Sequence, residues 1–360
     1  MKYISSERKR YLITYSTRKH RHELQRKEIR KQLKYKNLLK KIQARKVGKF
    51  ISDTNSVKHE TCLAPSIFSF TQDPDTAISY FQKSRKALDG NLPVFFDLTQ
   101  VTYMGPETLT YLCAFVKEDK IIKNNVVKGN VPNDPIIKQM FKKSGFYDLM
   151  SSGFSSNNES KDVDNKLIYK KTQERVESTL AGDVCKSAME HTFGTSDPKH
   201  QRFYRILIEC MGNTWNHANY ADRSETYSWW LLAYKEPSTK ITKFCFLDLG
   251  IGIFGSLEYK YKEHKLNELL KWFKPNKNKE TLGKIFKGQR RTSTKELAGR
   301  GQGLNYIYSL VKKDKTIKNF TLISNDIIAR IGYNADDKID KIKNGFIGTL
   351  YYWEIIPNHD

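Results

Sequence analysis

The chain has 360 residues, of which 38% are hydrophobic and 28% charged, and its formal net charge is +24. This length can form two ordinary domains, and the composition is typical of a soluble globular protein. No apolar run approaches the roughly 18 residues of a membrane span, and the basic N-terminus lacks the apolar core of a signal peptide, so we expect a cytoplasmic protein with no membrane segment.

The positive charge is concentrated at the N-terminus. Residues 1–50 hold 18 of the 63 lysines and arginines but only three acidic residues. Within this arm, residues 18–49 are predicted to form a basic helix with a thin apolar stripe. Such an arm would attract nucleic-acid phosphates or another polyanion, but the pattern fits a solvated helix equally well.

Residues 51–65 are polar and are predicted to be a linker. Strand and helix signals then alternate through residues 66–150, which predicts a small α/β domain. The expected elements are strands at 67–70, 93–98 and 125–128 and helices at 75–88, 107–117 and 134–143. The polar, low-complexity residues 151–160 follow and are the predicted domain boundary.

The remaining chain, residues 166–360, is predicted to be an α+β sandwich in which helices face a sheet. The expected elements are helices at 174–193, 200–217 and 304–312 and strands at 226–234, 241–247, 320–323 and 346–355. We expect the basic stretch 255–298 to be irregular.

The five cysteines are scattered and include no CxxC pair. This spacing predicts reduced, mostly buried thiols rather than a disulfide framework or a zinc site. They are Cys62, Cys113, Cys185, Cys210 and Cys245.

A polar stripe marks the helix at 200–217. Glu209, Asn213 and His217 are four residues apart, so they share one helix face. An amide oxygen suits a hydrated Mg²⁺ that already holds phosphates, and a carboxylate one turn away suits a general base. The alternative is a stripe that faces solvent.

A glycine-rich turn follows the strand at 241–247. Asp248 at a buried strand end could accept the exocyclic amine of adenine, and Gly250 and Gly252 would let the backbone approach the ring. An ordinary strand-to-loop turn is the alternative. With Gly255 the turn also spells GxGxxG, but we expect no βαβ unit after it and reject a dinucleotide fold.

A second glycine run opens the helix at 304–312. Gly299, Gly301 and Gly303 alternate with Arg300 and precede Leu304. Alternate glycines free backbone N–H groups to bind an anion, and the N-terminus of the helix adds partial positive charge. A flexible loop is the alternative.

A glycine–threonine pair, Gly348-Thr349, enters the last strand. Together with the three motifs above, it gives E-x3-N-x3-H-A, DxGxGI, GxGxGL and GT in that order. The set resembles the ATP site of the GHKL superfamily of gyrases, heat-shock chaperones and histidine kinases. The resemblance covers residues 166–357 and implies the Bergerat ATP-binding fold, with ATP and Mg²⁺ as ligands.

The resemblance also implies roles for these residues. Asn213 would bind Mg²⁺, Asp248 would bind adenine, and Glu209 would be the base in members that hydrolyse ATP. The remaining contacts with the nucleotide would come from His217, Gly250, Gly252, Gly299, Arg300, Gly301, Gly303, Leu304 and Thr349. Because members often dimerise, a homodimer is also expected.

Residues 254–298 would then form the ATP lid. Its cations could pair with the γ-phosphate, although most are expected to be solvated. They are Lys284, Lys287, Arg290, Arg291 and Lys295, with Arg300 just beyond.

The strand and helix at 94–117 resemble part of a STAS domain, the fold of anti-anti-sigma factors. Where that family commonly has Asp-Ser-Ser-Gly, this chain has Gly105-Pro106-Glu107-Thr108, without the phosphate-accepting serine. We therefore expect a docking domain rather than a phosphorylation switch.

Three functions fit these patterns. The first is an ATP-binding regulatory protein, a Mg²⁺-dependent ATPase whose lid closure switches contacts with a protein partner or nucleic acid. The second is an anti-sigma-type serine/threonine kinase that acts on a protein partner. The third is a nucleic-acid-binding protein that uses residues 1–50 and takes ATP only as a ligand.

Overall fold

The computed structural model describes residues 59–90, 92–123, 127–147, 167–172, 176–195, 201–217, 227–236, 238–264, 277–288 and 303–357. Residues His59–Asp360 form one compact unit. The predicted helix at 18–49 and the predicted boundary at 151–160 lie outside the described residues. In the ranges given, none of the helices has both the length and the apolar character of a membrane span.

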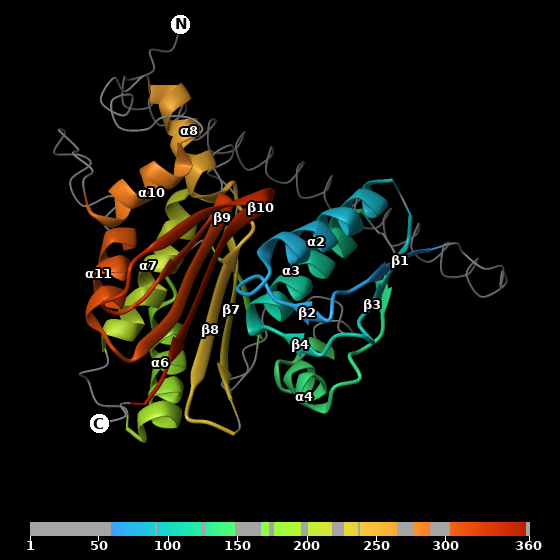
Figure 1. Cartoon of the computed structure of the whole chain (residues 1–360), viewed down its shortest axis with the longest axis horizontal. Helices are drawn as coiled ribbons and strands as arrows, with labels where there is room; N and C mark the ends of the chain where they lie inside the picture. The colour runs from blue at the N-terminus through green and yellow to red at the C-terminus, as the bar shows by residue number, and fades with distance from the viewer. Residues whose placement is uncertain are drawn as a thin grey trace, which may run out of the picture. The chain divides into compact units, whose positions relative to one another are not determined.

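Residues 60–147 alternate between strands and helices, as predicted (Figure 1). Strands β1 (Glu60–Leu63), β3 (Val94–Asp97) and β5 (Val127–Gly129) pair in parallel in that order, and β2 (Ile67–Phe68) pairs with β4 (Tyr103–Met104). The helices of this part are α2 (Pro74–Asp89), α3 (Pro106–Lys123) and α4 (Pro135–Lys143).

Capping residues explain where two of these helices begin. The Asp73 carboxylate accepts a hydrogen bond from the Thr76 amide at 3.1 Å, and Pro74 is the first residue of α2. The Asp134 carboxylate accepts bonds from the amides of Ile136 and Ile137, both at 2.9 Å. A carboxylate cap followed by proline satisfies free amides at a helix start and sets the first φ angle.

The second part is a five-stranded antiparallel sheet with helices on one face (Figure 1). Its order is β6 (Leu167–Thr172), β7 (Tyr227–Lys235), β8 (Thr242–Asp248), β10 (Lys338–Ile355) and β9 (Ile317–Ile331). The helices packed on this face are α6 (Ser178–Phe193), α7 (Gln201–His217) and α11 (Gly303–Lys313). The predicted combination of helices and a sheet is confirmed.

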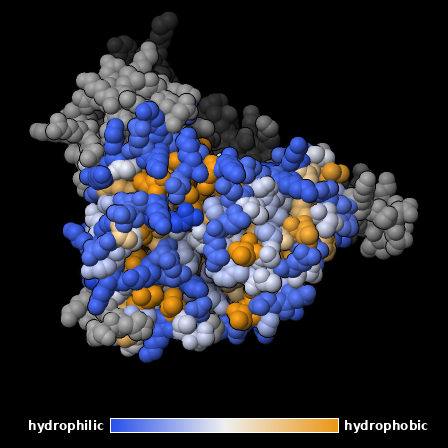
Figure 2. All heavy atoms as spheres, in the orientation of Figure 1, coloured by the Kyte–Doolittle hydropathy of each residue, from blue (hydrophilic) through white to orange (hydrophobic). Residues whose placement is uncertain are grey.

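The inner strands of this sheet are buried on both faces. On β7, Trp229 and Leu231 pack in the core beneath α6 and α7, whereas Trp230 and Leu232 pack in the core shared with residues 60–147. β8 and β10 alternate in the same way. This explains why these strands read as continuous apolar runs rather than as alternating ones. Figure 2 shows a largely hydrophilic surface with separate hydrophobic patches on the visible face.

Helices α2 and α3 cover the face of the sheet opposite α6 and α7 (Figure 1). The Phe346 ring of β10 packs against Phe70 and Tyr111, with ring centroids 5.5 and 5.3 Å apart. Arg330 of β9 donates to the Thr71 carbonyl at 3.1 Å. We call this contact between residues 60–147 and the sheet the seam.

Three sequence predictions about elements were wrong. Residues 60–63, placed in a linker, form β1, in which only Cys62 is buried. The stretch 255–298, expected to be irregular, contains most of α8 (Gly252–His264) and all of α10 (Asn278–Phe286), whose apolar residues are diluted by lysines. Strands β9 and β10 extend well beyond 320–323 and 346–355, because they continue as a ribbon past the sheet.

All five cysteines are free and buried, as predicted. Although α8 follows β8, both neighbours of β8 are antiparallel to it. The turn after β8 is therefore not part of a βαβ unit, which agrees with the rejection of a dinucleotide fold.

A buried carboxyl group lies at the seam. Glu107, in the first turn of α3, is fully buried, and its Oε1 accepts a hydrogen bond from the Ser69 hydroxyl at 2.7 Å. Its Oε2 has no hydrogen-bond partner. Burial raises the pKa of Glu107, although the bonds from Ser69 and Thr71 oppose this shift. The neutral acid is therefore favoured in the folded chain.

Glu107→Gln should change how stability depends on pH. The pKa of Glu107 is higher in the folded chain than in the unfolded chain. Its contribution to stability is therefore fully present at a pH below the unfolded pKa and is lost as the pH rises through the folded pKa. Relative to pH 4, the variant should gain about 1–3 kcal/mol over the wild type by pH 8. Denaturant unfolding between pH 4 and pH 8 measures this difference, and Glu190→Gln, at an exposed position on α6, is the control. Parallel curves for wild type and variant would contradict this expectation.

Candidate nucleotide site

The first half of the site is the polar stripe of α7. One side of α7 is anchored by Ile206, Leu207 and Cys210, which are fully buried against the sheet. Glu209 and Asn213 lie on the partly exposed side. The predicted pairing of these two on one face is confirmed. For His217, at the end of α7, the side chain lies outside the described residues.

The start of α11 meets this stripe. A Cβ atom on Gly303 would lie 2.6 Å from Glu209 Oε2 and 3.4 Å from Asn213 Oδ1. The first distance is shorter than real Cβ atoms show, so any larger residue would displace the carboxylate. The glycine thus lets the N-terminus of a helix, with its partial positive charge, approach an acceptor pair.

Arg205 also contacts the stripe, and sequence analysis missed it. Its Nε lies 3.6 Å from Glu209 Oε1, and its guanidinium lies 4.0 Å from the centroid of the Tyr306 ring on α11. Its position four residues before Glu209 was a visible signal. Arg205 therefore links the Glu209 carboxylate to α11.

The second half of the site is the end of β8. Asp248 is 5% exposed, and its Oδ1 accepts a hydrogen bond from the Gly250 amide at 3.0 Å. Burial raises the pKa of Asp248 to about 7, while bonds from Gly250 and the Thr214 hydroxyl act to lower it. Thr214 follows Asn213 on α7, so this helix touches both halves of the site.

Strand β10 supplies the wall beside Asp248. Thr349 is its cross-strand partner in the antiparallel ladder. Gly348 has φ +88°, and a Cβ there would lie 1.9 Å from the Asp248 carbonyl oxygen. The backbone of Gly348 therefore packs directly against the backbone of Asp248, and only glycine leaves room for this contact.

Ser324 and Asn325 of β9 hold the turn after Asp248, and sequence analysis missed both. Asn325 accepts a hydrogen bond from the Phe254 amide at 3.1 Å and donates to the Ile251 carbonyl at 3.0 Å. Ser324 accepts from the Ile253 amide at 2.9 Å and donates to the Gly348 carbonyl at 3.0 Å. These hydrogen bonds hold the turn close to Asn325, so a Cβ atom added at Gly252 would collide with the Asn325 side chain. A polar pair inside an apolar strand was the available signal.

The remaining predicted site residues are less well defined. Leu304 packs against the core on the helix side of the sheet. Gly299, Arg300 and Gly301 lie outside the described residues, as do Arg290, Arg291 and Lys295 of the predicted lid. Lys284 and Lys287 lie within and just after α10.

The residues fit a magnesium–nucleotide complex better than a metal held by protein alone. The described residues include no group of three or more His, Cys, Asp or Glu that could hold an ion. Mg²⁺ in nucleotide sites is usually held by one or two protein groups together with the phosphates. The Asn213 Oδ1 atom, which lies beside Gly303 at the N-terminus of α11, could be such a protein ligand.

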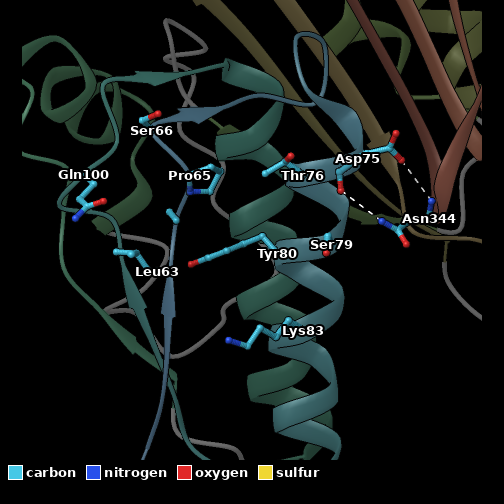
Figure 3. Close-up of a pocket in the computed structure, with 11 residues that line it drawn as sticks. Leu63, Pro65, Ser66, Asp75, Thr76, Ser79, Tyr80, Lys83, Gln100 and Asn344 are labelled. Atoms are coloured by element: carbon cyan, nitrogen blue, oxygen red, sulfur yellow. Dashed lines mark hydrogen bonds between the residues drawn. The ribbon is translucent and has the colours of Figure 1, made fainter.

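A separate cavity of about 610 Å³ lies between α2 and the chain joining β1 to β2 (Figure 3). Several of its polar groups already have partners. The Tyr80 hydroxyl donates to the Cys62 carbonyl at 3.2 Å, and Lys83 pairs with Glu60 at 3.4 Å. Figure 3 also shows Asp75 hydrogen-bonded to Asn344 at the edge of the cavity. We assign this cavity no ligand.

No model of a known protein family matches the chain, and comparison with curated proteins finds no match either.

Gly348→Ala should destabilise the fold, because alanine disfavours the φ of Gly348 and its methyl would collide with the Asp248 carbonyl. We expect a loss of about 1–3 kcal/mol or more in denaturant unfolding. Gly345→Ala is the matched control on the same strand, because no atom within 4 Å would meet its Cβ. Equal stability of the two variants would show that the close approach is not required.

Proposed function

We propose that the chain is an ATP-binding regulatory protein of the GHKL type, a Mg²⁺-dependent ATPase whose lid closure changes its contacts with a partner. In this proposal residues 166–360 are the Bergerat domain and residues 66–150 are STAS-like. The observation that carries it is the approach of Gly303 to both Glu209 and Asn213, on the helix that also reaches Asp248 through Thr214.

The environment of Asp248 supports adenine recognition. The carboxylate is buried at a strand end beside a glycine turn that Ser324 and Asn325 hold in place. A buried acceptor with a fixed position suits the exocyclic amine of adenine. Guanine would present an oxygen there and leave two acceptors facing each other.

The α7 stripe and the start of α11 would bind the phosphate end. Asn213 would hold Mg²⁺ through its amide oxygen, and the ion would neutralise charge on the phosphates. Glu209 would accept a proton from the attacking water as the bond between the γ-phosphorus and ADP breaks. Arg205 would keep the Glu209 carboxylate in place through their ion pair.

The ribbon formed by β9 and β10 supports a switch. At the start of α10, within the proposed lid, Asn278 donates to Asp326 of β9 at 2.5 Å. Asp326 lies opposite the irregular segment of β10 between Lys341 and Phe346. A shift of α10 would therefore act directly on this segment.

Helix α2 holds the same segment of β10 from the other side. Asp75 accepts a hydrogen bond from the Lys343 amide at 2.7 Å, and Gln82 donates to the Gly345 carbonyl at 3.0 Å. Lid closure would thus change the seam, and with it the surface that residues 60–147 offer to a partner.

Asp248→Asn should reduce the preference for adenine. At pH 8, above its raised pKa of about 7, the wild-type carboxylate is charged and only accepts hydrogen bonds. Asparagine can also donate to the guanine oxygen, so we expect the ratio of ATP to GTP affinity to fall by about tenfold or more. Titration of both nucleotides measures this ratio. A protein indifferent to adenine nucleotides would refute the proposal.

Glu209→Gln should bind ATP but release phosphate at least about 100-fold more slowly, because the amide cannot take a proton from water. The control is Glu190→Gln, at an exposed position on α6. Unchanged phosphate release would reject the assigned base. Radiolabel moving from ATP to protein instead of to phosphate would indicate the kinase alternative.

A further inference from the structure

We propose that Tyr351 is a positioning residue that turns the amide oxygen of Asn213 toward the metal-binding side of the nucleotide site. This inference rests on the proposed function. It adds a residue that lies in none of the four sequence motifs.

The geometry places Tyr351 directly beneath the site. It lies on β10, two residues after Thr349, is 1% exposed, and faces the helix layer with Trp353. Its hydroxyl accepts a hydrogen bond from Asn213 Nδ2 at 3.3 Å. The other end of the same amide, Oδ1, lies toward Gly303. The two ends of the amide therefore face different surroundings.

An asparagine amide has an acceptor end and a donor end, and only the oxygen can bind a cation. Rotation by half a turn would present two N–H groups to the ion. The Tyr351 hydroxyl opposes this rotation, because it gives the nitrogen a partner on the side of the sheet.

A purely structural role is the competing explanation, since a buried tyrosine hydroxyl generally needs a hydrogen-bond partner. The two explanations differ when residue 213 is an aspartate. The two oxygens of a carboxylate are equivalent, so no orientation has to be fixed. A positioning role predicts that the hydroxyl then becomes dispensable, whereas a structural role predicts that it still matters.

The experiment compares wild type, Tyr351→Phe, Asn213→Asp and the double variant, each titrated with ATP in Mg²⁺ and in EDTA. Tyr351→Phe should weaken binding of Mg-ATP by about two- to tenfold, the range expected for one hydrogen bond. Its affinity for ATP in EDTA should match that of wild type. In the Asn213→Asp background the phenylalanine should cause no further loss.

Tyr352→Phe is the matched control. Tyr352 is the next residue on β10 but faces the seam, where its hydroxyl bonds Glu354. It should leave the affinity for Mg-ATP unchanged. Thermal unfolding of each variant checks folding. If Tyr351→Phe does not fold, NMR of the Asn213 side-chain amide in the wild type still tests the idea, because its hydrogen bond to the Tyr351 hydroxyl should persist when Mg-ATP binds and loss of that bond on binding would overturn it.

Three results would overturn the inference while leaving the proposed function intact. They are unchanged Mg-ATP affinity in Tyr351→Phe, an equal loss in EDTA, and an equal loss in the Asn213→Asp background. A wild-type protein that binds no adenine nucleotide under either condition would overturn the proposed function and this inference with it.

Discussion

Burial of the five-stranded sheet on both faces is the constraint on which the other features depend. Each inner strand must carry apolar side chains on both sides, and one set packs on α6 and α7 while the other packs on α2 and α3. Such a sheet cannot lose either cover without exposing large aromatic residues such as Trp230 or Trp353. Residues 60–147 therefore contribute to the stability of the fold.

Strand β10 connects the two covers to the candidate site. Its early part is held by α2 through Asp75, its Gly348 lies against the backbone of Asp248, and its Tyr351 contacts α7. These contacts follow one another along a single strand, which pairs with β9 and, from Thr349 onward, also with β8. A displacement at one of these contacts would therefore affect the others, which lie only a few residues away on the same strand.

Local patterns predicted from the sequence were the reliable ones. The shared face of Glu209 and Asn213 follows from helical spacing, and the helix predicted at 75–88 from its apolar pattern matches α2 to within one residue at each end. Long-range relations could not be predicted, because the register that pairs Thr349 with Asp248 depends on the whole sheet. Asn325 was missed for the same reason. The lysine-rich sequence of α10 concealed buried positions such as Leu282 and Phe286. The roles assigned to the site residues remain predictions.

The alternation of Tyr351 and Tyr352 limits how the chain length can vary. Neighbouring residues of a strand point to opposite faces, so inserting or deleting one residue between Gly348 and Tyr351 would exchange the two phenols across the sheet. Tyr351 would then lie on the face covered by α2 and α3, and Tyr352 on the face covered by α6 and α7. The irregular segment between Lys341 and Phe346 interrupts the ladder and could absorb such a change. A further register shift lies between Phe346 and Thr349, so a change in length is accommodated before Thr349 rather than between Thr349 and Tyr351.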